Sequence, residues 1–231
     1  MSDAPGARRV TDASGARRVL LAAFVVAVAV DLAALLAGHQ TGHQVTKPLL
    51  MPLLAAYAAV CGAPRTLVVA LLFGWGGDVF LLLDAEWAFL VGMGSFAAGH
   101  VCYLFLFGRA RTAPALGAAY AAALAVTVAL LWPGLPAGLR VPVAGYAALL
   151  TAMAYRAGGR GARTGAGGAL FLLSDTLIAA GVANWAQPPV PDFWIMLTYT
   201  LAQYLLTAGV LRAAALPADR AGVPGPPRVS R

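Results

Sequence analysis

The sequence predicts an all-α fold, namely a polytopic membrane protein with eight transmembrane helices. Hydrophobic residues make up 61% of the 231 residues and charged residues only 11%, whereas about a quarter of the residues of a soluble domain are charged. A soluble fold of this length could not cover so much apolar surface with polar groups, and a bilayer removes that requirement. Divided into spans of about 20 residues with short connections, the chain has room for about eight helices.

Eight apolar runs follow one another along the chain, and each is expected to be a helix because a lipid-facing backbone must satisfy its own hydrogen bonds. Strands are not expected, since no run alternates apolar with polar residues over the length of a barrel strand. The second run is the shortest, and partial re-entry into the membrane is the alternative for it. The runs are Leu20–Leu36, Pro48–Cys61, Thr66–Leu83, Trp87–Phe107, Pro114–Leu131, Val141–Tyr155, Ala166–Ala183 and Phe193–Leu211.

The chain is expected to form one membrane domain between two polar tails. Residues 1–18 contain Gly and Arg, and residues 217–231 are rich in Pro, Gly and Arg, so both segments are predicted to be disordered in the cytoplasm. Residues 19–216 are predicted to form the eight-helix membrane domain.

The charges of the connections indicate the orientation. With the N-terminus in the cytoplasm, Lys47 and Arg140 are the only basic residues that fall in outside segments. The outside segments also collect Asp84, Glu86 and Asp192. The excess of positive charge inside supports both the count of eight spans and a cytoplasmic location of both termini. Lys47 is the only lysine and Ala and Gly are abundant, which fits a high-GC bacterium and its inner (plasma) membrane.

Composition and motifs exclude several classes of function. The net charge of +7 does not indicate nucleic-acid binding, because no basic stretch is interleaved with aromatic residues. Cys61 and Cys102 lie in or at the end of apolar runs and are expected to be free packing residues. No zinc-like ligand spacing, Gly-x-Ser-x-Gly elbow or phosphate-binding glycine loop is present, so no metal or cofactor is expected. The oligomeric state is not encoded in any recognisable pattern.

A weak internal similarity suggests a duplication. The segment Phe73–Asp78 resembles Phe171–Asp175, and the segment Phe96–His100 resembles Tyr199–Gln203. Together they are compatible with a parallel repeat of four plus four helices around an axis along the membrane normal.

Ionisable residues inside the spans are the candidates for function, because burying them in a bilayer is costly. Asp78 and Asp175 are expected about 8 and 12 Å below the outer ends of their spans. Lys47 and Glu86 are expected at the outer rim, and His100 near the midplane. A polar cavity that opens outward would collect most of them. The remaining polar candidates inside the spans are Asp31, Tyr199 and Gln203.

Each candidate also has a purely structural interpretation. Asp31 is expected to pair with a backbone or hydroxyl group, Lys47 can be an interfacial anchor, and His100 can be a hydrogen-bonded packing residue. Asp78 and Asp175 lie well inside their spans and occupy equivalent positions in the weak repeat, so a functional role is favoured for this pair.

Five segments in this order resemble the YhhN-like lysoplasmalogenase family over residues 20–213. The resemblance implies a hydrolase that cleaves the vinyl-ether bond of a lysoplasmalogen to a fatty aldehyde and a glycerophospho-amine, without a metal. The aspartates of its Gly-Asp and Ser-Asp motifs, the proposed catalytic pair, correspond to Asp78 and Asp175. The segments are Thr46–Met51, Gly77–Leu81, Phe89–Tyr103 with His100, Phe171–Asp175, and Tyr199 with Gln203.

Two carboxyl groups can carry this chemistry. Protonation of the vinyl ether at its β-carbon gives an oxocarbenium ion, water adds, and the hemiacetal collapses to the aldehyde. The deeper Asp175 is the hypothetical general acid and Asp78, nearer Lys47, the ionised partner, although the reverse assignment is also open. Lys47 could instead bind the phosphate of the lipid. The residues expected to bind the substrate or to orient the pair are Lys47, His100, Tyr103, Tyr199 and Gln203.

Two other functions remain open at this stage. A proton- or solute-coupled transporter could use the same column of polar residues as a pathway, and an internal duplication suits transporters. The second alternative is a membrane protein that binds lipid without catalysing a reaction. Cleavage of a vinyl ether, compared with its saturated analogue, distinguishes the hydrolase from both.

Overall fold

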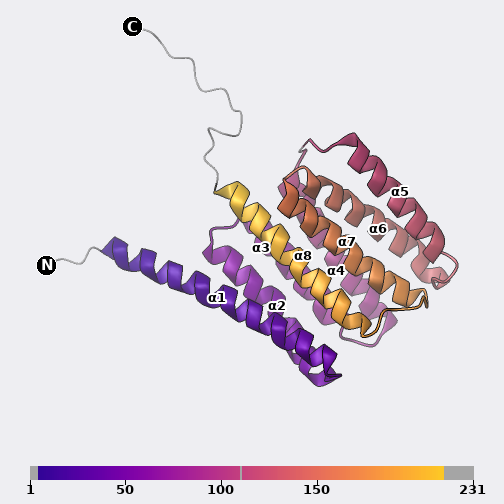
Figure 1. Ribbon diagram of the computed structural model, residues 1–231, viewed down its shortest axis with the longest axis horizontal. Coiled ribbons are helices and arrows are strands. Elements are labelled where there is room, and N and C mark those ends of the chain that lie inside the picture. Colours follow the sequence, from indigo (N-terminus) through magenta and orange to yellow (C-terminus); the bar gives the residue numbers. More distant parts are fainter. Residues whose placement is uncertain (1–4, 110, 216–231) are drawn as a thin grey trace, which may run out of the picture.

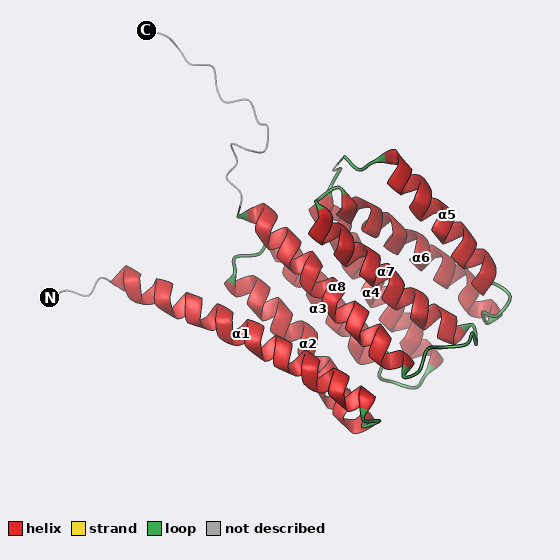
Figure 2. Ribbon diagram, in the orientation of Figure 1, coloured by secondary structure: helices red, strands yellow, loops and turns green. Residues whose placement is uncertain are grey.

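Eight helices account for most of residues 5–109 and 111–215, which the computed structural model of this protein describes. No strand occurs in these ranges (Figure 2), so the predicted all-α class is confirmed. The helices are α1 (Pro5–Leu36), α2 (Gln40–Val60), α3 (Arg65–Phe80), α4 (Glu86–Phe107), α5 (Pro114–Leu131), α6 (Ala137–Gly158), α7 (Ala162–Val182) and α8 (Pro191–Ala214).

The helices pack into a bundle in which most neighbours along the chain are also neighbours in space. Helices α1 to α4 contact one another in order, α4 then packs against α6, α6 against α7, and α7 against α8. Helix α8 returns to contact α1, α2 and α3. Helix α5 lies at the periphery, against α6 and α7 (Figure 1). Residues that are far apart in the sequence therefore meet where α3, α4, α6, α7 and α8 face the interior.

Six of the eight helices are long and apolar enough to cross a membrane. They include α1 from Ser14 onward and α4 to α8, whereas α2 and α3 are not among them. Large apolar side chains point outward from the bundle, with Phe105 78% and Val141 74% exposed. Such a surface is compatible with lipid and not with water, so the fold is that of a polytopic membrane protein.

The second helix begins earlier than predicted. It starts at Gln40 and not at Pro48, so Pro48 as the start of the helix is wrong, and Pro48 and Pro52 lie inside the helix. The predicted start was defined by the beginning of the apolar run. The first turns of α2 are polar, so they were assigned to the preceding loop. As a result Lys47 lies about 10 Å from the beginning of α2 and is buried.

The boundaries of the other helices lie within a few residues of the predicted runs. Helix α6 is longer at both ends than Val141–Tyr155. Helix α1 includes residues 5–18 of the segment that was expected to be disordered, and residues 1–4 and 216–231, with the predicted C-terminal tail, lie outside the described residues. The division into a membrane domain with two disordered tails therefore stays a prediction.

Several arginines bind carbonyl groups at the C-terminal ends of helices. Arg160 Nε donates to Phe107 O at 2.7 Å at the end of α4, and Arg17 Nε donates to Val60 O at 3.3 Å at the end of α2. Because a helix C-terminus carries partial negative charge, these contacts stabilise the helix ends. They also gather positive charge at the end of the bundle opposite the α1–α2 connection, where α2 and α4 finish.

Candidate active site

A hydrogen-bonded chain joins the first candidate aspartate to three other predicted residues. Tyr199 Oη on α8 donates to Asp78 Oδ2 on α3 at 2.8 Å. Gln203 Nε2, one turn further along α8, donates to Tyr199 Oη at 3.4 Å, and Tyr103 Oη on α4 donates to Gln203 Oε1 at 2.7 Å. Asp78 is only 2% exposed, so this chain supplies a polar environment to a carboxyl group in the interior of the bundle.

Glycines on α3 allow this close approach. A Cβ atom at Gly77 would overlap the ring of Phe96 on α4, and one at Gly74 would lie 2.9 Å from Gln203 Nε2 and 3.2 Å from Tyr199 Oη. Side chains of α4 and α8 therefore pack directly on the backbone of α3. The absence of a side chain at these two positions leaves the room in which Tyr199 reaches Asp78.

Lys47 on α2 is an electrostatic partner of Asp78, in addition to the contacts that Asp78 has with α8. It lies on α2 and is 9% exposed. It interacts electrostatically with Asp78, as do the more weakly coupled Asp31 and His43. Asp78 thus has a tyrosine hydroxyl from α8 as a hydrogen-bond donor and a cation from α2 as an electrostatic partner.

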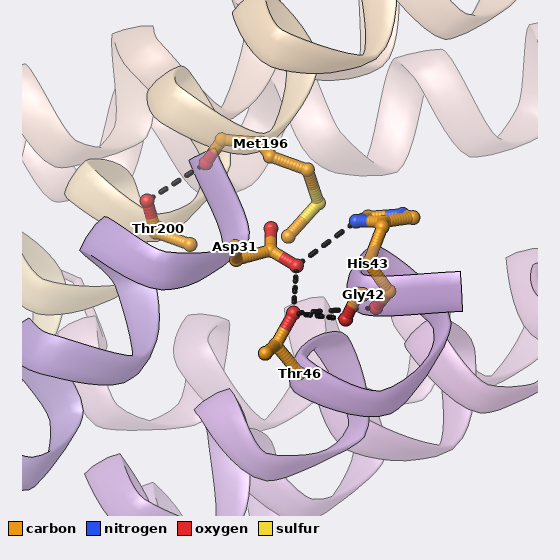
Figure 3. A network of polar contacts seen from close by, with 6 residues as sticks. All are labelled: Asp31, Gly42, His43, Thr46, Met196 and Thr200. Carbon is orange, nitrogen blue, oxygen red and sulfur yellow. Dashed lines mark hydrogen bonds and ion pairs between the residues drawn. The ribbon is translucent and has the colours of Figure 1, made fainter. Parts of the chain in front are cut away.

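A separate polar network connects α1 and α2 (Figure 3). Asp31 Oδ1 lies 2.9 Å from His43 Nδ1 and accepts a hydrogen bond from Thr46 Oγ1 at 2.5 Å. The expectation that Asp31 pairs with a hydroxyl group is confirmed. His43 was missed by the sequence reasoning, although it lies four residues before Lys47 and hence on the same face of α2.

The second candidate aspartate is held by a residue that the sequence reasoning missed. Tyr146 Oη on α6 donates a short hydrogen bond to Asp175 Oδ2 on α7. His100 Nε2 on α4 lies 3.0 Å from the same Tyr146 oxygen. Tyr146 is nine residues into α6 and Asp175 seven residues from the end of α7. Both residues therefore lie at a similar depth below the end of the bundle at which α6 begins and α7 ends. This similar depth, which Tyr199 shares, was the signal from which their proximity could have been predicted.

The two hydrogen bonds of Tyr146 define the protonation of His100. Its Nδ1 is buried and has no hydrogen-bond partner among the described residues. A buried N–H without an acceptor is costly, so the ring proton belongs on Nε2, which donates to Tyr146 Oη. Tyr146 then donates its own proton to Asp175, and the direction of the chain from His100 to Asp175 is fixed.

Aromatic rings fill the space between the two aspartates. Phe96 and Phe171 each pack edge-to-face on Tyr199, with ring centroids 5.8 and 5.4 Å apart, and Phe171 also packs on His100 at 4.7 Å. Asp78 and Asp175 interact electrostatically across this cluster. The predicted polar column is therefore two hydrogen-bonded clusters, one around each aspartate, joined by aromatic packing.

Asp175 and Tyr146 form a wall between two small cavities. The first, of about 40 Å³, is otherwise apolar and is lined by Leu81, which follows α3, and by residues of α4, α6 and α7 that include Phe89, Met93 and Phe96. The second, of about 50 Å³, lies between α5, α6 and α7 and includes Arg140. Either volume exceeds the roughly 10–15 Å³ that one water molecule needs. Asp78 lines neither of these two cavities.

A comparison with protein families identifies the chain. The sequence model of the YhhN family matches residues 42–210. The chain belongs to the YhhN family. The resemblance predicted from five sequence segments is thereby confirmed, and the matched range contains both aspartates, both tyrosines that bind them and His100.

Relatives of this YhhN-family chain are named as lysoplasmalogenases. Lysoplasmalogenase TMEM86B of Homo sapiens is 35% identical over 153 residues, which cover 66% of this chain and 66% of the relative. Lysoplasmalogenase TMEM86B of Sus scrofa is 38% identical over 157 residues, or 67% of each chain. The lysoplasmalogenase of Mycobacterium tuberculosis (strain CDC 1551 / Oshkosh) is 34% identical over 177 residues, or 69% of this chain and 65% of the relative.

The matches thus span about two thirds of the length of these curated relatives. No solved structure matches the chain. Within residues 5–109 and 111–215, no group of three or more His, Cys, Asp or Glu side chains is arranged to hold a metal ion. The Asp78 and Asp175 clusters are the sites on which a function can be argued.

Proposed function

We propose that this protein is a membrane hydrolase that cleaves the vinyl-ether bond of a lysoplasmalogen and releases a fatty aldehyde and a glycerophospho-amine. The observation that carries the proposal is the position of Asp175. Its carboxyl group is held by Tyr146 between an apolar cavity and a second cavity that is lined in part by Arg140. The membership of the YhhN family and the names of the relatives support the same reaction.

Asp175 is the general acid in this proposal. Its proton is transferred to the β-carbon of the vinyl ether, the C=C bond is lost, and the oxocarbenium ion forms at the carbon next to the ether oxygen. The hydrogen bond from Tyr146 occupies Oδ2, which leaves Oδ1 to carry the proton. The ionised Asp175 then accepts a proton from the water molecule that attacks the cation, and the hemiacetal forms.

Collapse of the hemiacetal completes the reaction. The bond between the former vinyl carbon and the glycerol oxygen breaks as the glycerol oxygen takes the proton from Asp175. The hydroxyl group of the hemiacetal gives its proton to the Asp175 carboxylate, the carbon becomes the carbonyl carbon of the aldehyde, and the acid is regenerated. Each cavity beside Asp175 is large enough for the water molecule that this sequence consumes.

Asp78 is the ionised partner in this proposal. Lys47 and the hydroxyl group of Tyr199 surround it with positive charge and a hydrogen-bond donor, and both favour a carboxylate. Because Asp78 lies outside the two cavities beside Asp175, it acts on the oxocarbenium ion through its field and not by contact. Such fixed charge is effective in an apolar interior.

The topology belongs to the same proposal. We infer eight spans, including α2 and α3, with both termini in the cytoplasm and the candidate site near the outer leaflet. The contacts of α1 to α4 in order parallel those of α5 to α8, which supports the repeat and relates Asp78 on α3 to Asp175 on α7. A cysteine at Asp84, in a chain without Cys61 and Cys102, should react with an impermeant maleimide added to intact cells. Reaction only after permeabilisation would contradict this orientation.

A substrate comparison tests the reaction. Purified protein in detergent is incubated with a lysoplasmalogen and, separately, with its saturated alkyl-ether analogue, and aldehyde release is measured. We expect aldehyde from the vinyl ether alone, and none from the Asp175→Asn or Asp78→Asn variants, each checked for folding by gel filtration. Activity retained in either variant would refute the two-carboxylate mechanism. Absence of cleavage by the wild type, combined with solute flux in liposomes, would favour a transporter.

A further inference from the structure

Arg140 lies on the same cavity as the proposed general acid. It is the fourth residue of α6, it is half-buried, and it lines the cavity of about 50 Å³ together with Tyr146 and Asp175. Six residues of α6 separate Arg140 from Tyr146, a rise of about 9 Å along the helix. Arg140 is therefore close to the beginning of α6, while the acid lies deeper in the bundle.

The guanidinium group of Arg140 has no counter-charge among residues 5–109 and 111–215. Its Nε donates to Leu135 O at 3.2 Å, and its Cζ lies 5.9 Å from the centre of the Trp132 ring. No carboxylate forms an ion pair with Arg140 in the described part of the chain. The carbonyl group and the indole ring restrain the side chain, and the remaining N–H groups of its planar fork suit the two oxygens of a phosphate.

The two cavities are both mostly apolar, and they differ in that Arg140 lines only one of them. They share Tyr146 and Asp175. On one side of these residues the lining is apolar, with Phe89 and Met93. On the other side the lining contains Arg140. A lipid with one chain, an ether bond and a phosphate, in that order, matches this sequence of environments.

We propose that Arg140 binds the phosphate of the lysophospholipid while the chain carbons next to the ether bond lie on the Phe89 and Met93 side of Asp175, so that the ether bond lies at Asp175. This subsite rests on the proposed function for its position relative to the reaction. Lys47, the other cation expected near this end of the protein, lies on α2, interacts with Asp78 and lines neither cavity. The phosphate is therefore assigned to Arg140 and not to Lys47.

The test compares two substrates that differ only in the phosphate. Aldehyde release is measured from a lysoplasmalogen with an ethanolamine headgroup and from the corresponding 1-alkenylglycerol in the same mixed micelles. For Arg140→Ala we expect kcat/KM to fall about 10- to 100-fold on the phospholipid, mainly through KM, and to stay unchanged on the alkenylglycerol. Arg140→Lys keeps the charge but loses the planar fork of N–H groups, so its kcat/KM on the phospholipid should lie between those of the wild type and Arg140→Ala.

Two further variants define the control. Arg65→Ala removes an exposed arginine at the start of α3, at the opposite end of that helix from Asp78, and should change neither substrate. Lys47→Met should lower kcat on both substrates equally, because it acts through Asp78. An equal loss on both substrates in Arg140→Ala, or no loss on either, would overturn the assignment.

A binding measurement separates this subsite from the hydrolase proposal. The saturated alkyl-ether lysophosphoethanolamine and the matching alkylglycerol, neither of which has a vinyl ether, are titrated against wild type and Arg140→Ala while the melting temperature is followed. We expect the phospholipid to stabilise the wild type more than the variant, and the alkylglycerol to affect both alike. If the phospholipid stabilises the wild type more than the variant but no vinyl ether is cleaved, the hydrolase proposal is refuted and the phosphate subsite stands. If the vinyl ether is cleaved but the phospholipid stabilises both proteins alike, only the subsite is refuted.

Discussion

Tyr146 on α6 donates its hydroxyl proton to Asp175 on α7, and its oxygen lies 3.0 Å from His100 Nε2 on α4. One phenol thus connects three helices at the wall between the two cavities. Since His100 Nδ1 has no hydrogen-bond partner in the part of the chain that the structure describes, the histidine is restricted to one tautomer and the hydrogen bonds run in one direction. Tyr146 is therefore a positioning residue that selects which oxygen of Asp175 is available for proton transfer.

Removing the hydroxyl group of Tyr146 should impair catalysis more than binding. In Tyr146→Phe, Asp175 loses the donor that occupies Oδ2, and its proton is no longer restricted to Oδ1. We expect kcat to fall about 10- to 100-fold, the range that corresponds to one hydrogen bond to a charged group, with little change in KM. Aldehyde release at varied lysoplasmalogen concentration measures both constants.

A second tyrosine on the same helix provides the control for this variant. Tyr155 Oη donates to Thr112 O at 3.3 Å, far along α6 from Asp175. Tyr155→Phe should leave kcat unchanged. If Tyr146→Phe and Tyr155→Phe lower kcat alike, or if the effect of Tyr146→Phe lies entirely in KM, Tyr146 does not position the acid.

The hydroxyl group of Tyr199 should contribute to stability as well as to activity. Tyr199→Phe leaves Asp78 Oδ2 without this donor in a site that is 2% exposed. Loss of a hydrogen bond to a buried group costs about 1–3 kcal/mol, so the melting temperature should fall along with the rate of aldehyde release. In the background of Asp78→Asn the same substitution should cost less, because the two residues share one interaction. Additive losses of stability in the double variant would contradict this coupling.

The sequence predicted the aspartates because charge is conspicuous in an apolar run. Asp78 and Asp175 were selected by this criterion, and each has a tyrosine partner inside the bundle. The expected depth of Asp78 below the end of its helix, about 8 Å, is wrong, because α3 ends at Phe80, about 3 Å beyond Asp78. Tyr146 was not found, since a tyrosine in a membrane span is common and its partner on another helix cannot be read from one helix alone.

The arrangement of the site in two clusters could not be predicted from the sequence either. Depth along a helix can be counted in residues, but the rotation of each helix and the order of its neighbours depend on packing. Helix α4 packs against α6 and α8 returns to α3, and it is this packing that lets His100 reach Tyr146 and Tyr199 reach Asp78. The start of α2 was misplaced because Gln40, His43 and Thr46 are polar, although His43 and Thr46 bind a buried partner, Asp31.

A methyl group at Gly77 should disturb the Asp78 cluster through the ring of Phe96. The added Cβ atom would overlap this ring, and Phe96 is packed against Tyr199 and Phe171, so the ring cannot move freely. Overpacking of this kind costs about 1–3 kcal/mol. We expect Gly77→Ala to lower both the melting temperature and the rate of aldehyde release.

Gly94 on α4 is the matched control for this substitution. A Cβ atom at Gly94 meets nothing within 4 Å, and alanine favours a helix over glycine by about 1 kcal/mol. Gly94→Ala should therefore leave activity unchanged and keep or raise the melting temperature. A melting temperature of Gly77→Ala at or above that of the wild type would mean that Phe96 is not held as tightly as its ring contacts indicate.

The Asp31 and His43 pair should respond differently to single and to double substitution. Asp31 is 1% exposed and its Oδ2 has no hydrogen-bond partner among the described residues, so the carboxyl group depends on His43 and Thr46. In His43→Leu, Asp31 loses its nitrogen partner, and removal of one member of a buried pair costs about 3–5 kcal/mol. Replacement of both residues in Asp31→Leu/His43→Leu removes the unpaired charge and should restore much of the melting temperature.

Activity distinguishes a structural from a functional role of this pair. Asp31 and His43 both interact electrostatically with Asp78, but less strongly than Lys47 does. If the pair mainly joins α1 to α2, the double variant should release aldehyde at a rate close to that of the wild type once it is folded. Stability restored with a loss of kcat comparable to that of Lys47→Met would instead show that Asp31 and His43 contribute to the charge that Asp78 needs, and would extend the site to α1.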